Sequence, residues 1–275
     1  MSRYRLSLLV FLALVALPGQ GHPLRMVVHD FAPFTFADEA GRAQGALVEL
    51  VKEACRRRAE GCEILYRPSR RARLMLERGW VDAMFPLGVT PERLVKLNFS
   101  APIASTRYGF YCASDSPLQT LSADTLSGMK VGTFGPSFTQ YLLEQVNQEV
   151  MARTGVGMTL DVQPNADAKG LAKLVYRRYP LYFSNIHSAD YHLRQNKLSG
   201  VRQLGGVNLK VEYRIGFAKG RVSPDEVSRF NGLLHQLEKE GVASRIRARW
   251  QLSEPDLGAP LTSLGALDLL RDDHS

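Results

Sequence analysis

The order of apolar segments constrains this chain most, because short strand-like runs alternate with helix-like runs along most of its length. The first set comprises strands at Leu24–Val28, Glu63–Tyr66 and Val81–Phe85, with helices between them at 46–59 and 70–78. Strands that alternate with helices favour a mostly parallel sheet with helices packed on its faces. The sequence therefore predicts an α/β protein.

A second set of the same kind begins after Ser114-Asp115-Ser116-Pro117. It comprises strands at Met129–Phe134, Thr159–Val162 and Leu181–Ser184, and helices at 138–152, 166–177 and 186–195. A third piece, a strand at Arg214–Ala218 followed by helical patterns to Trp250, is too short to fold alone and should complete the first set.

The prediction is therefore two lobes, each a parallel-type sheet flanked by helices. Lobe 1 comprises 22–105 and 210–252, and lobe 2 comprises 106–209. The chain would cross between them near 104–107 and again near 207–213. Two connecting strands form a hinge that can close on a ligand held between the lobes.

Composition limits the class of protein further. Of 275 residues, 45% are hydrophobic and 23% are charged, which is typical of a globular protein and excludes a disordered, collagen-like or polytopic membrane chain. The net charge of +8 is spread along the sequence. Its densest run, Arg56 to Arg58, lies at a predicted helix end, where cations offset the helix dipole. Since nucleic-acid binders concentrate positive charge on one face, we expect no nucleic-acid partner.

The first 21 residues have the pattern of a secretory signal peptide. A basic segment, Met1 to Arg5, precedes an apolar run from Leu6 to Leu17, and small residues follow up to Gly21. The apolar run is much shorter than the ~20 residues that a membrane span needs, and no cysteine follows it for a lipid anchor. We expect an exported, periplasmic protein that starts near His22 and is not inserted in a membrane. A buried N-terminal helix is the alternative.

Export to an oxidising compartment allows disulfides to persist. Cys55 lies late in an amphipathic helix, and Cys62 follows the helix stop at Gly61, where the chain doubles back. A bridge between them is compatible with this arrangement and would contribute ~2 to 3 kcal/mol. Cys112 lies in an apolar strand-like segment and should pack as a small hydrophobic residue. Metal ligation is the weaker interpretation, since there is no CxxC pair or Cys/His cluster, and we expect no metal or cofactor.

Ligands of open α/β sheets bind at the carboxyl ends of the strands, so the residues after each strand are informative. After Phe85, Thr90 is a natural N-cap and Pro91 suits the first helical position, which places Arg93 in the first helical turn. A cation there opposes the helix dipole unless an anion is bound nearby. Thr90 and Arg93 are therefore candidate ligand residues. The alternative is a solvated Arg93 paired with Glu92.

Several motifs together resemble a known family. In chain order they are Phe31-Ala32-Pro33-Phe34, Gly41, Gly45, Gly79-x-x-Asp82, Thr90-Pro91-Glu92-Arg93, Phe99-Ser100-x-Pro102 and Gly128-Met129-Lys130-Val131-Gly132. Over residues 24–252 this pattern resembles the bacterial periplasmic solute-binding proteins for polar amino acids, the extracellular family 3 of uptake systems. The resemblance implies the type II periplasmic-binding-protein fold. The Cys55-x6-Cys62 spacing is similar to a disulfide in the histidine and lysine-arginine-ornithine binders.

The resemblance also implies roles for individual residues. The arginine that matches Arg93 grips the ligand α-carboxylate. Phe31 matches an aromatic residue that stacks on the ligand side chain, although a core phenylalanine is the alternative. Ser137 lies near the family's Ser or Thr at the start of the second-lobe helix, and pure capping with Gln140 is the alternative. Gly88 stands where the family has Ser or Thr, so only its backbone can contact the carboxylate.

Asn185 is the main departure from the family pattern. It follows the strand Leu181–Ser184, where the family has an aspartate that pairs with the ligand α-ammonium group. Asparagine lacks the charge, and charge-assisted hydrogen bonds are roughly twice as strong as neutral ones. A zwitterionic amino acid therefore suits the site less well, and a mainly anionic ligand becomes the alternative. Arg71, at the start of the helix after the second strand, is a candidate second cation, and a surface arginine is the alternative. The segment Pro68-Ser69-Arg70-Arg71-Ala72 resembles a Pro-Trp-x-Arg-Ala pattern of a less characterised branch, with Ser69 in place of the tryptophan.

Together these features predict a monomeric receptor that captures a small polar or anionic, amino-acid-like solute and delivers it to an ABC-type membrane permease. The alternatives are a ligand-sensing partner of a signalling receptor and an exported dehydratase-like enzyme on the same fold. We expect no catalysis, since no HExxH, GxSxG, phosphate-binding glycine loop or Cys–His pairing stands out. Residues 253–275 are predicted to be a loose tail with a weak helix near Leu264 to Leu270.

Overall fold

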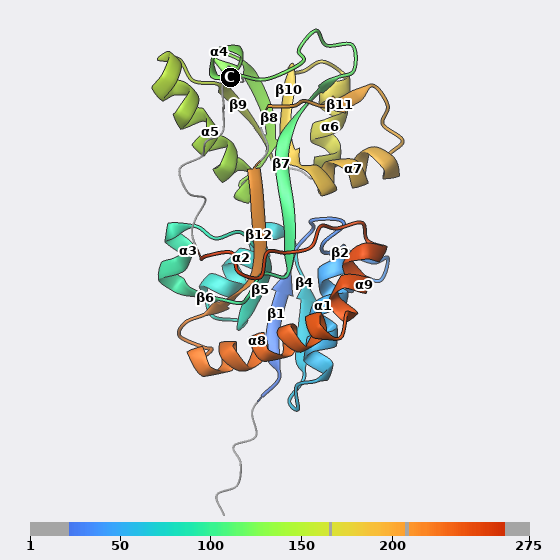
Figure 1. Ribbon diagram of the computed structural model, residues 1–275, viewed down its shortest axis with the longest axis vertical. Helices are drawn as coiled ribbons and strands as arrows, with labels where there is room; N and C mark the ends of the chain where they lie inside the picture. Colours follow the sequence, from blue (N-terminus) through green and yellow to red (C-terminus); the bar gives the residue numbers. More distant parts are fainter. Residues whose placement is uncertain (1–21, 165–166, 207–208, 262–275) are drawn as a thin grey trace, which may run out of the picture.

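The computed structural model describes residues 22–164, 167–206 and 209–261. Two lobes lie one above the other in Figure 1, and two long strands, β7 (Ala104–Ala113) and β12 (Leu209–Ala218), run between them. The predicted signal peptide, the predicted tail helix and part of the second predicted crossing, residues 207–208, lie outside the described residues.

The lower lobe of Figure 1 is built from the two ends of the described chain. Its elements are β1 (Leu24–Val28), β2 (Phe36–Ala37), β3 (Ala43–Gln44), α1 (Ala46–Arg56), β4 (Cys62–Tyr66), α2 (Ser69–Glu77), β5 (Ala83–Leu87), α3 (Pro91–Lys96), β6 (Leu97–Phe99), α8 (Pro224–Lys239) and α9 (Val242–Arg249). Helices α8 and α9, from the third predicted segment, therefore lie in this lobe.

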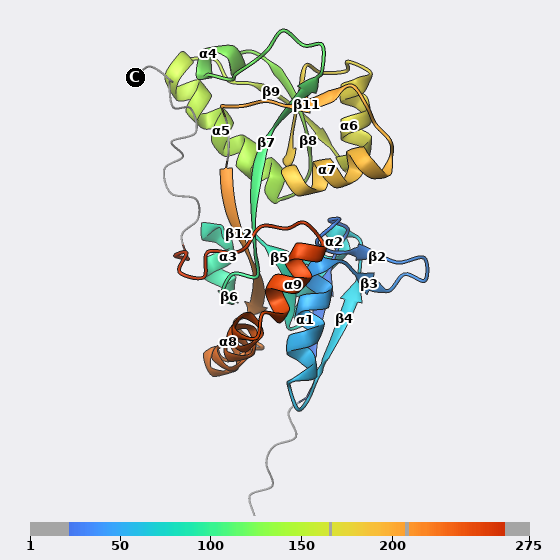
Figure 2. The same cartoon turned by 45° about the vertical axis from the view of Figure 1, so that its right-hand side comes forward.

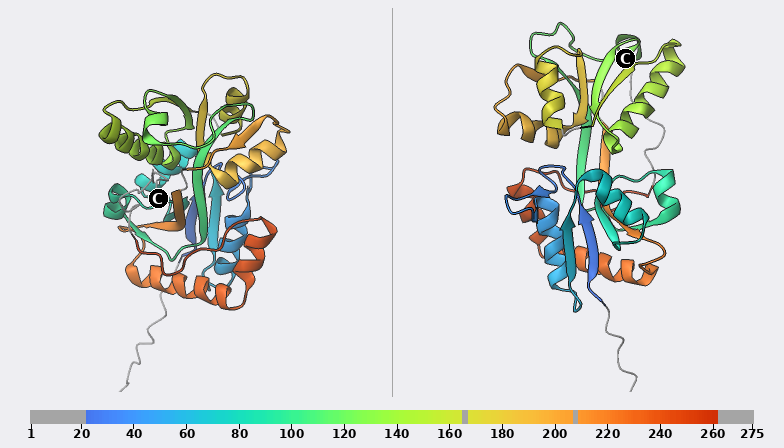
Figure 3. Two further views of the ribbon diagram at one scale, coloured as in Figure 1. Left: turned by 45° about the horizontal axis from the view of Figure 1, so that its top comes forward. Right: turned by 180° about the vertical axis from the view of Figure 1, so that it is seen from behind.

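The upper lobe is one continuous stretch of chain, visible from behind in Figure 3. Its elements are α4 (Ala123–Leu126), β8 (Lys130–Phe134), α5 (Phe138–Thr154), β9 (Thr159–Gln163), α6 (Asp167–Val175), β10 (Leu181–Asn185), α7 (Ile186–Gln195) and β11 (Val201–Gln203).

The strands form one continuous sheet in the order β4-β1-β5-β12-β7-β10-β8-β9. Strands β4, β1 and β5 are parallel, as are β10, β8 and β9. Strands β12 and β7 pair antiparallel from Leu209↔Tyr108 to Tyr213↔Ala104. The sequence predicts two sheets; the structure joins them because the two crossing strands bond to each other as well as to both halves.

Alternate residues of β1 show that helices cover both faces of the lower half of the sheet. Met26 and Val28 pack in one apolar cluster with residues of α1, whereas Val27 packs in a second cluster with Ala72 and Met75 of α2. Helices α1, α8 and α9 contact one another on the first face, as Figure 2 shows. A sheet buried on both faces explains the near-continuous apolar character of the predicted strands.

Strand β5 begins two residues later than the sequence predicts. Asp82, which the prediction places inside the strand, instead accepts a hydrogen bond from the backbone N–H of Arg25 at 2.8 Å and pairs with Arg221 at 2.7 Å. The strand therefore starts at Ala83 and continues to Leu87, directly before the predicted ligand residues.

The predicted disulfide is present. Cys55 at the end of α1 and Cys62 at the start of β4 are bridged with a Cα–Cα distance of 5.4 Å, and Cys112 is buried and unbridged. Among the described residues, no helix is both long and apolar enough to cross a membrane.

Candidate functional site

A small cavity of about 40 Å³ lies between the lobes. Its wall is formed by residues after β1, by β5 and the residue that follows it, by α2 and α3, by the two crossing strands, by the end of β8 and by the start of α5. None of its lining residues is an aspartate or a glutamate. Ligand pockets usually measure about 300 to 1,000 Å³, so a solute the size of an amino acid requires the lobes to separate or a side chain to move.

Arg93 reaches this cavity because of how α3 begins. The Thr90 hydroxyl oxygen accepts a hydrogen bond from the Arg93 backbone N–H at 3.2 Å, and Pro91 occupies the first helical turn, as the sequence predicts. The guanidinium donates to the Gly88 carbonyl oxygen at 2.8 Å and lies 5.5 Å from the centre of the Phe138 ring. Thr90 itself is buried and lies outside the cavity lining.

The charge of Arg93 is not neutralised within the part of the chain that the structure describes. It forms no ion pair there. Its backbone N–H donates to the Thr90 hydroxyl and its guanidinium donates to the Gly88 carbonyl, and it has no other hydrogen-bond acceptor among the described residues. Burial lowers the pKa of the guanidinium, and the positive charge of Arg73 lowers it further. A partly buried cation with spare donors therefore faces the space between the lobes.

Gly88 is explained by the second lobe. A Cβ atom added at this position would lie 2.2 Å from Cζ of Phe138, closer than real contacts allow. The Phe138 ring thus occupies the space that a serine or threonine side chain would need. Glycine here lets the first residue of α5 pack directly against the end of β5.

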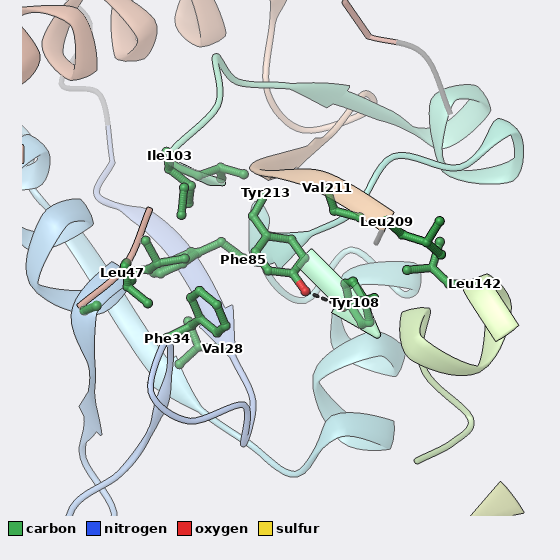
Figure 4. Close-up of a cluster of buried hydrophobic side chains, with 14 of the residues drawn as sticks. Val28, Phe34, Leu47, Phe85, Ile103, Tyr108, Leu142, Leu209, Val211 and Tyr213 are labelled. Atoms are coloured by element: carbon green, nitrogen blue, oxygen red, sulfur yellow. Dashed lines mark hydrogen bonds between the residues drawn. The ribbon is translucent and has the colours of Figure 1, made fainter. Parts of the chain in front are cut away.

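Phe31 lines the cavity within an aromatic cluster. Its ring stacks on Phe34 with centroids 5.0 Å apart and meets the edge of Tyr213 at 5.7 Å. The Tyr213 hydroxyl is hydrogen-bonded to that of Tyr108 on the neighbouring strand, a contact drawn as a dashed line in Figure 4. Tyr108 lies on β7 and Tyr213 on β12, so this aromatic cluster includes residues of both crossing strands.

Ser137 also lines the cavity, and its hydroxyl has two partners. It accepts a hydrogen bond from the Gln140 backbone N–H at 3.2 Å, as an N-cap does, and donates to the Phe134 carbonyl oxygen at 2.6 Å. Capping is therefore present. A direct role of this residue in ligand binding stays a prediction.

Asn185 lies outside the cavity lining and is fully buried at the start of α7. Its Oδ1 accepts from the Ser188 backbone N–H at 3.1 Å, and its Nδ2 donates to Thr106 Oγ1 at 2.8 Å and to the Tyr213 hydroxyl at 3.3 Å. An aspartate has no N–H to donate, so asparagine suits a position that ties α7 to both crossing strands. The sequence does not indicate this use of the side chain.

Arg71 is exposed on α2 and does not line the cavity, whereas Arg73 does. Ala72 and Met75 are the buried residues of this helix, and Ser69 lies on the cavity side four residues before Arg73. Residues four apart share one face of a helix, so Ser69 and Arg73 point the same way. The helical phase of the buried residues was the signal that could have favoured Arg73.

His29, after β1, is a lining residue that the sequence does not single out. Burial lowers its pKa to about 4; the hydrogen bond to the Asp30 carbonyl opposes this, and the charges of Arg93 and Arg73 add to it. The ring is therefore neutral at pH 7.

The ligand-free protein should lose stability in acid through His29. Between pH 6.5 and pH 4 the unfolded chain binds a proton at this ring and the folded chain does not, so the free energy of unfolding falls as the pH falls through this range. One pKa unit corresponds to about 1.4 kcal/mol, and partial exposure of the ring reduces the full value, so we expect a loss of about 1 to 2 kcal/mol.

Urea unfolding at pH 7 and at pH 4.5 tests this, with His29→Asn as the matched variant, because its amide N–H replaces the Nδ1–H bond to Asp30. The variant should lose about 1 to 2 kcal/mol less than the wild-type protein over the same interval. An equal loss in both proteins would contradict the assignment to His29.

Two α/β lobes, joined by two crossing strands and enclosing a cationic cavity, define a two-lobed binding protein of the type II periplasmic class. Comparison with known families agrees with this class. The family model of bacterial extracellular solute-binding proteins, family 3, matches residues 24–253, and this chain belongs to that family. No curated protein sequence matches the chain.

Solved structures show the same fold. An ancestral arginine-binding protein bound to arginine is 21% identical, covers 84% of this chain and 99% of its own, and superposes with a TM-score of 0.69. A histidine kinase sensor domain with similarity to periplasmic binding proteins is 22% identical, with coverages of 85% and 99% and a TM-score of 0.71. A protein from the study of glutathione import via GshT and the cystine importer of Streptococcus mutans is 16% identical, with coverages of 86% and 99% and a TM-score of 0.73. At these identities the likeness shows the fold alone.

Proposed function

We propose that this protein captures a small anionic solute between its lobes and that Arg93 binds the anionic group. The observation that carries the proposal is the guanidinium of Arg93, which is partly buried between the lobes and has no carboxylate partner in the described part of the chain. Hydrogen bonds from a guanidinium to a carboxylate are charge-assisted and bidentate, and they strengthen where water is excluded. A carboxylate held there would satisfy the remaining donors.

The cavity favours an anion over a zwitterion. Among the residues that the structure describes, no aspartate or glutamate lines it, and the amide of Asn185 is used by the crossing strands. A ligand ammonium group would therefore lose its water without gaining an ionised partner, which is costly. The rings of Phe31 and Phe138 offer apolar contact to the rest of the solute.

Family membership supports a role in the periplasm, and delivery of the solute to an ABC-type permease is the use we favour. The sensor-domain relative supports a second candidate, a receptor that reports the solute to a signalling protein. Both candidates use the same site.

Calorimetry and native mass spectrometry on protein recovered from the periplasm test the binding function. The informative pair is an amino acid and the carboxylate that lacks only its ammonium group, such as glutamate and glutarate, or leucine and 4-methylpentanoate. We expect the carboxylate of a pair to bind at least tenfold more tightly, since 1.4 kcal/mol separates affinities tenfold. Tighter binding of the amino acid would overturn the proposed ligand class, and absence of binding by every carboxylate would overturn the anion site.

A further inference from the structure

Arg73 is the second guanidinium of the cavity. It lies in the middle of α2, and the cavity side of this helix also carries Ser69. The neighbouring Arg70 and Arg71 are exposed on other faces of the same helix. A helix that carries three arginines thus directs only one of them between the lobes.

Arg73 is partly buried and forms no ion pair or hydrogen bond with any residue that the structure describes. Other buried arginines of this protein are satisfied. Arg247 is bonded to the carboxylates of Glu238 and Glu254, and Arg214 to backbone carbonyl groups. The fold therefore supplies acceptors where an arginine has only a structural role, and it supplies none to Arg73.

Arg73 and Arg93 line the same cavity, and their charges affect the same groups. The charge of Arg73 contributes to the lowered pKa of Arg93, and both contribute to the lowered pKa of His29. Two like charges at one cavity repel each other unless counter-charge is bound, and one monovalent anion compensates only one of them.

There is also room beside the pair for a ligand longer than the cavity between the lobes. Arg73 and Arg93, with Met84 and Leu87, border a second space of about 490 Å³ between α2, α3 and the turn after β12. Leu76 and Leu97 add apolar lining, and the carboxylates of Glu77 and Glu92 are outnumbered in the same lining by cations, since Lys96, Lys219 and Arg221 join the two arginines. A short carbon chain that ends in a second anionic group fits a space of this kind.

We propose that Arg73 is a second anion-binding residue and that the natural solute is a small dicarboxylate, with one carboxylate on Arg93 and the other on Arg73. The inference rests on the proposed anion site and makes that site more specific. In this proposal Arg73 makes the affinity for ligands with two negative charges higher than the affinity for ligands with one.

The test uses dicarboxylates from malonate to adipate, each with the monocarboxylate of the same length, and calorimetry on the full exported protein. In the wild-type protein the best dicarboxylate should bind at least tenfold more tightly than its monocarboxylate. In Arg73→Gln the dicarboxylate should lose roughly ten- to a hundredfold in affinity, whereas the monocarboxylate should change less than threefold.

Arg71→Gln is the matched control, because it removes the same charge from an exposed position of the same helix. It should change neither affinity by more than threefold. An equal loss for both ligand types in Arg73→Gln, or the same loss in Arg71→Gln, would overturn the role of Arg73. Equal binding of mono- and dicarboxylates by the wild-type protein would overturn the dicarboxylate while leaving Arg93 as the anion site. If no carboxylate binds at all, the proposed function itself fails.

Discussion

Arg93→Ala should abolish measurable binding of the anionic solute, with a loss of at least a hundredfold in affinity. The substitution removes the guanidinium that faces the space between the lobes and leaves the ligand carboxylate without its charged partner. Truncating one partner of a buried, hydrogen-bonded charge pair costs about 2 to 5 kcal/mol, and 1.4 kcal/mol is a factor of ten. Calorimetry with the best-binding carboxylate measures the loss.

The loss should arise at the site rather than from unfolding. Arg93 is unpaired and lies in the first turn of α3, where a cation opposes the helix dipole, so alanine should leave the melting temperature unchanged or raise it slightly. Arg71→Ala is the matched control, since Arg71 is an exposed cation on the neighbouring helix α2 and lines neither the cavity nor the space beside it. It should bind as the wild-type protein does.

Arg93→Lys separates charge from shape. Lysine keeps the charge but has neither the planar fork that bonds a carboxylate twice nor the flat face that lies against Phe138. We expect intermediate affinity. Affinity in Arg93→Ala equal to that of the wild-type protein would show that the anion binds elsewhere.

The position of Arg93 at the start of α3 could be predicted from the sequence because it depends on local chemistry. An N-cap at Thr90 and a proline at the first helical position determine where Arg93 stands, and both are visible in the residues, although the strand before them ends at Leu87 and not at the predicted Phe85. The disulfide between Cys55 and Cys62 was predictable for the same reason, since both cysteines flank one helix end. The strand and helix order, and hence the two-lobed fold, likewise followed from local patterns.

Other parts of the site depend on residues that meet only after folding. Asn185 is the last residue of β10, one position from where the sequence places the strand end, and its amide bonds to Thr106 and Tyr213, which come from the two crossing strands. Nothing near Gly88 in the sequence indicates that Phe138, fifty residues later, fills the space beside it. Contacts between lobes are therefore what sequence reasoning misses.

The choice of Arg71 in place of Arg73 as a cavity residue is a different kind of miss. Both residues lie on α2, and they differ by about 200° around the helix axis, since each residue turns the chain by about 100°. The position of Arg71 at the start of the helix favoured it, whereas the buried positions Ala72 and Met75 set the helical phase. Burial periodicity is the better guide where the two disagree.

Arg247→Ala should cost about 3 to 5 kcal/mol in the free energy of unfolding, the largest effect on stability that we expect. The side chain of Arg247 is 0% exposed and pairs with Glu238 at 2.6 Å and with Glu254, joining α8, α9 and the segment after α9. Removal of the arginine leaves two carboxylates close together without a cation. Breaking a buried ion pair from one side is costly for this reason, even where the intact pair adds little net stability.

Urea unfolding at pH 7 measures this cost, and Arg249→Ala is the matched control. Arg249 lies two residues later on α9 and pairs with Glu49 at 2.6 Å, but its side chain is 63% exposed. Exposed pairs contribute about 0 to 1 kcal/mol, so this variant should lose less than 1 kcal/mol. Equal losses in the two variants would show that the Arg247 charges are better solvated than their burial indicates. The triple variant with Arg247→Met, Glu238→Gln and Glu254→Gln should have a higher free energy of unfolding than Arg247→Met alone, because no unpaired charge then remains in this cluster.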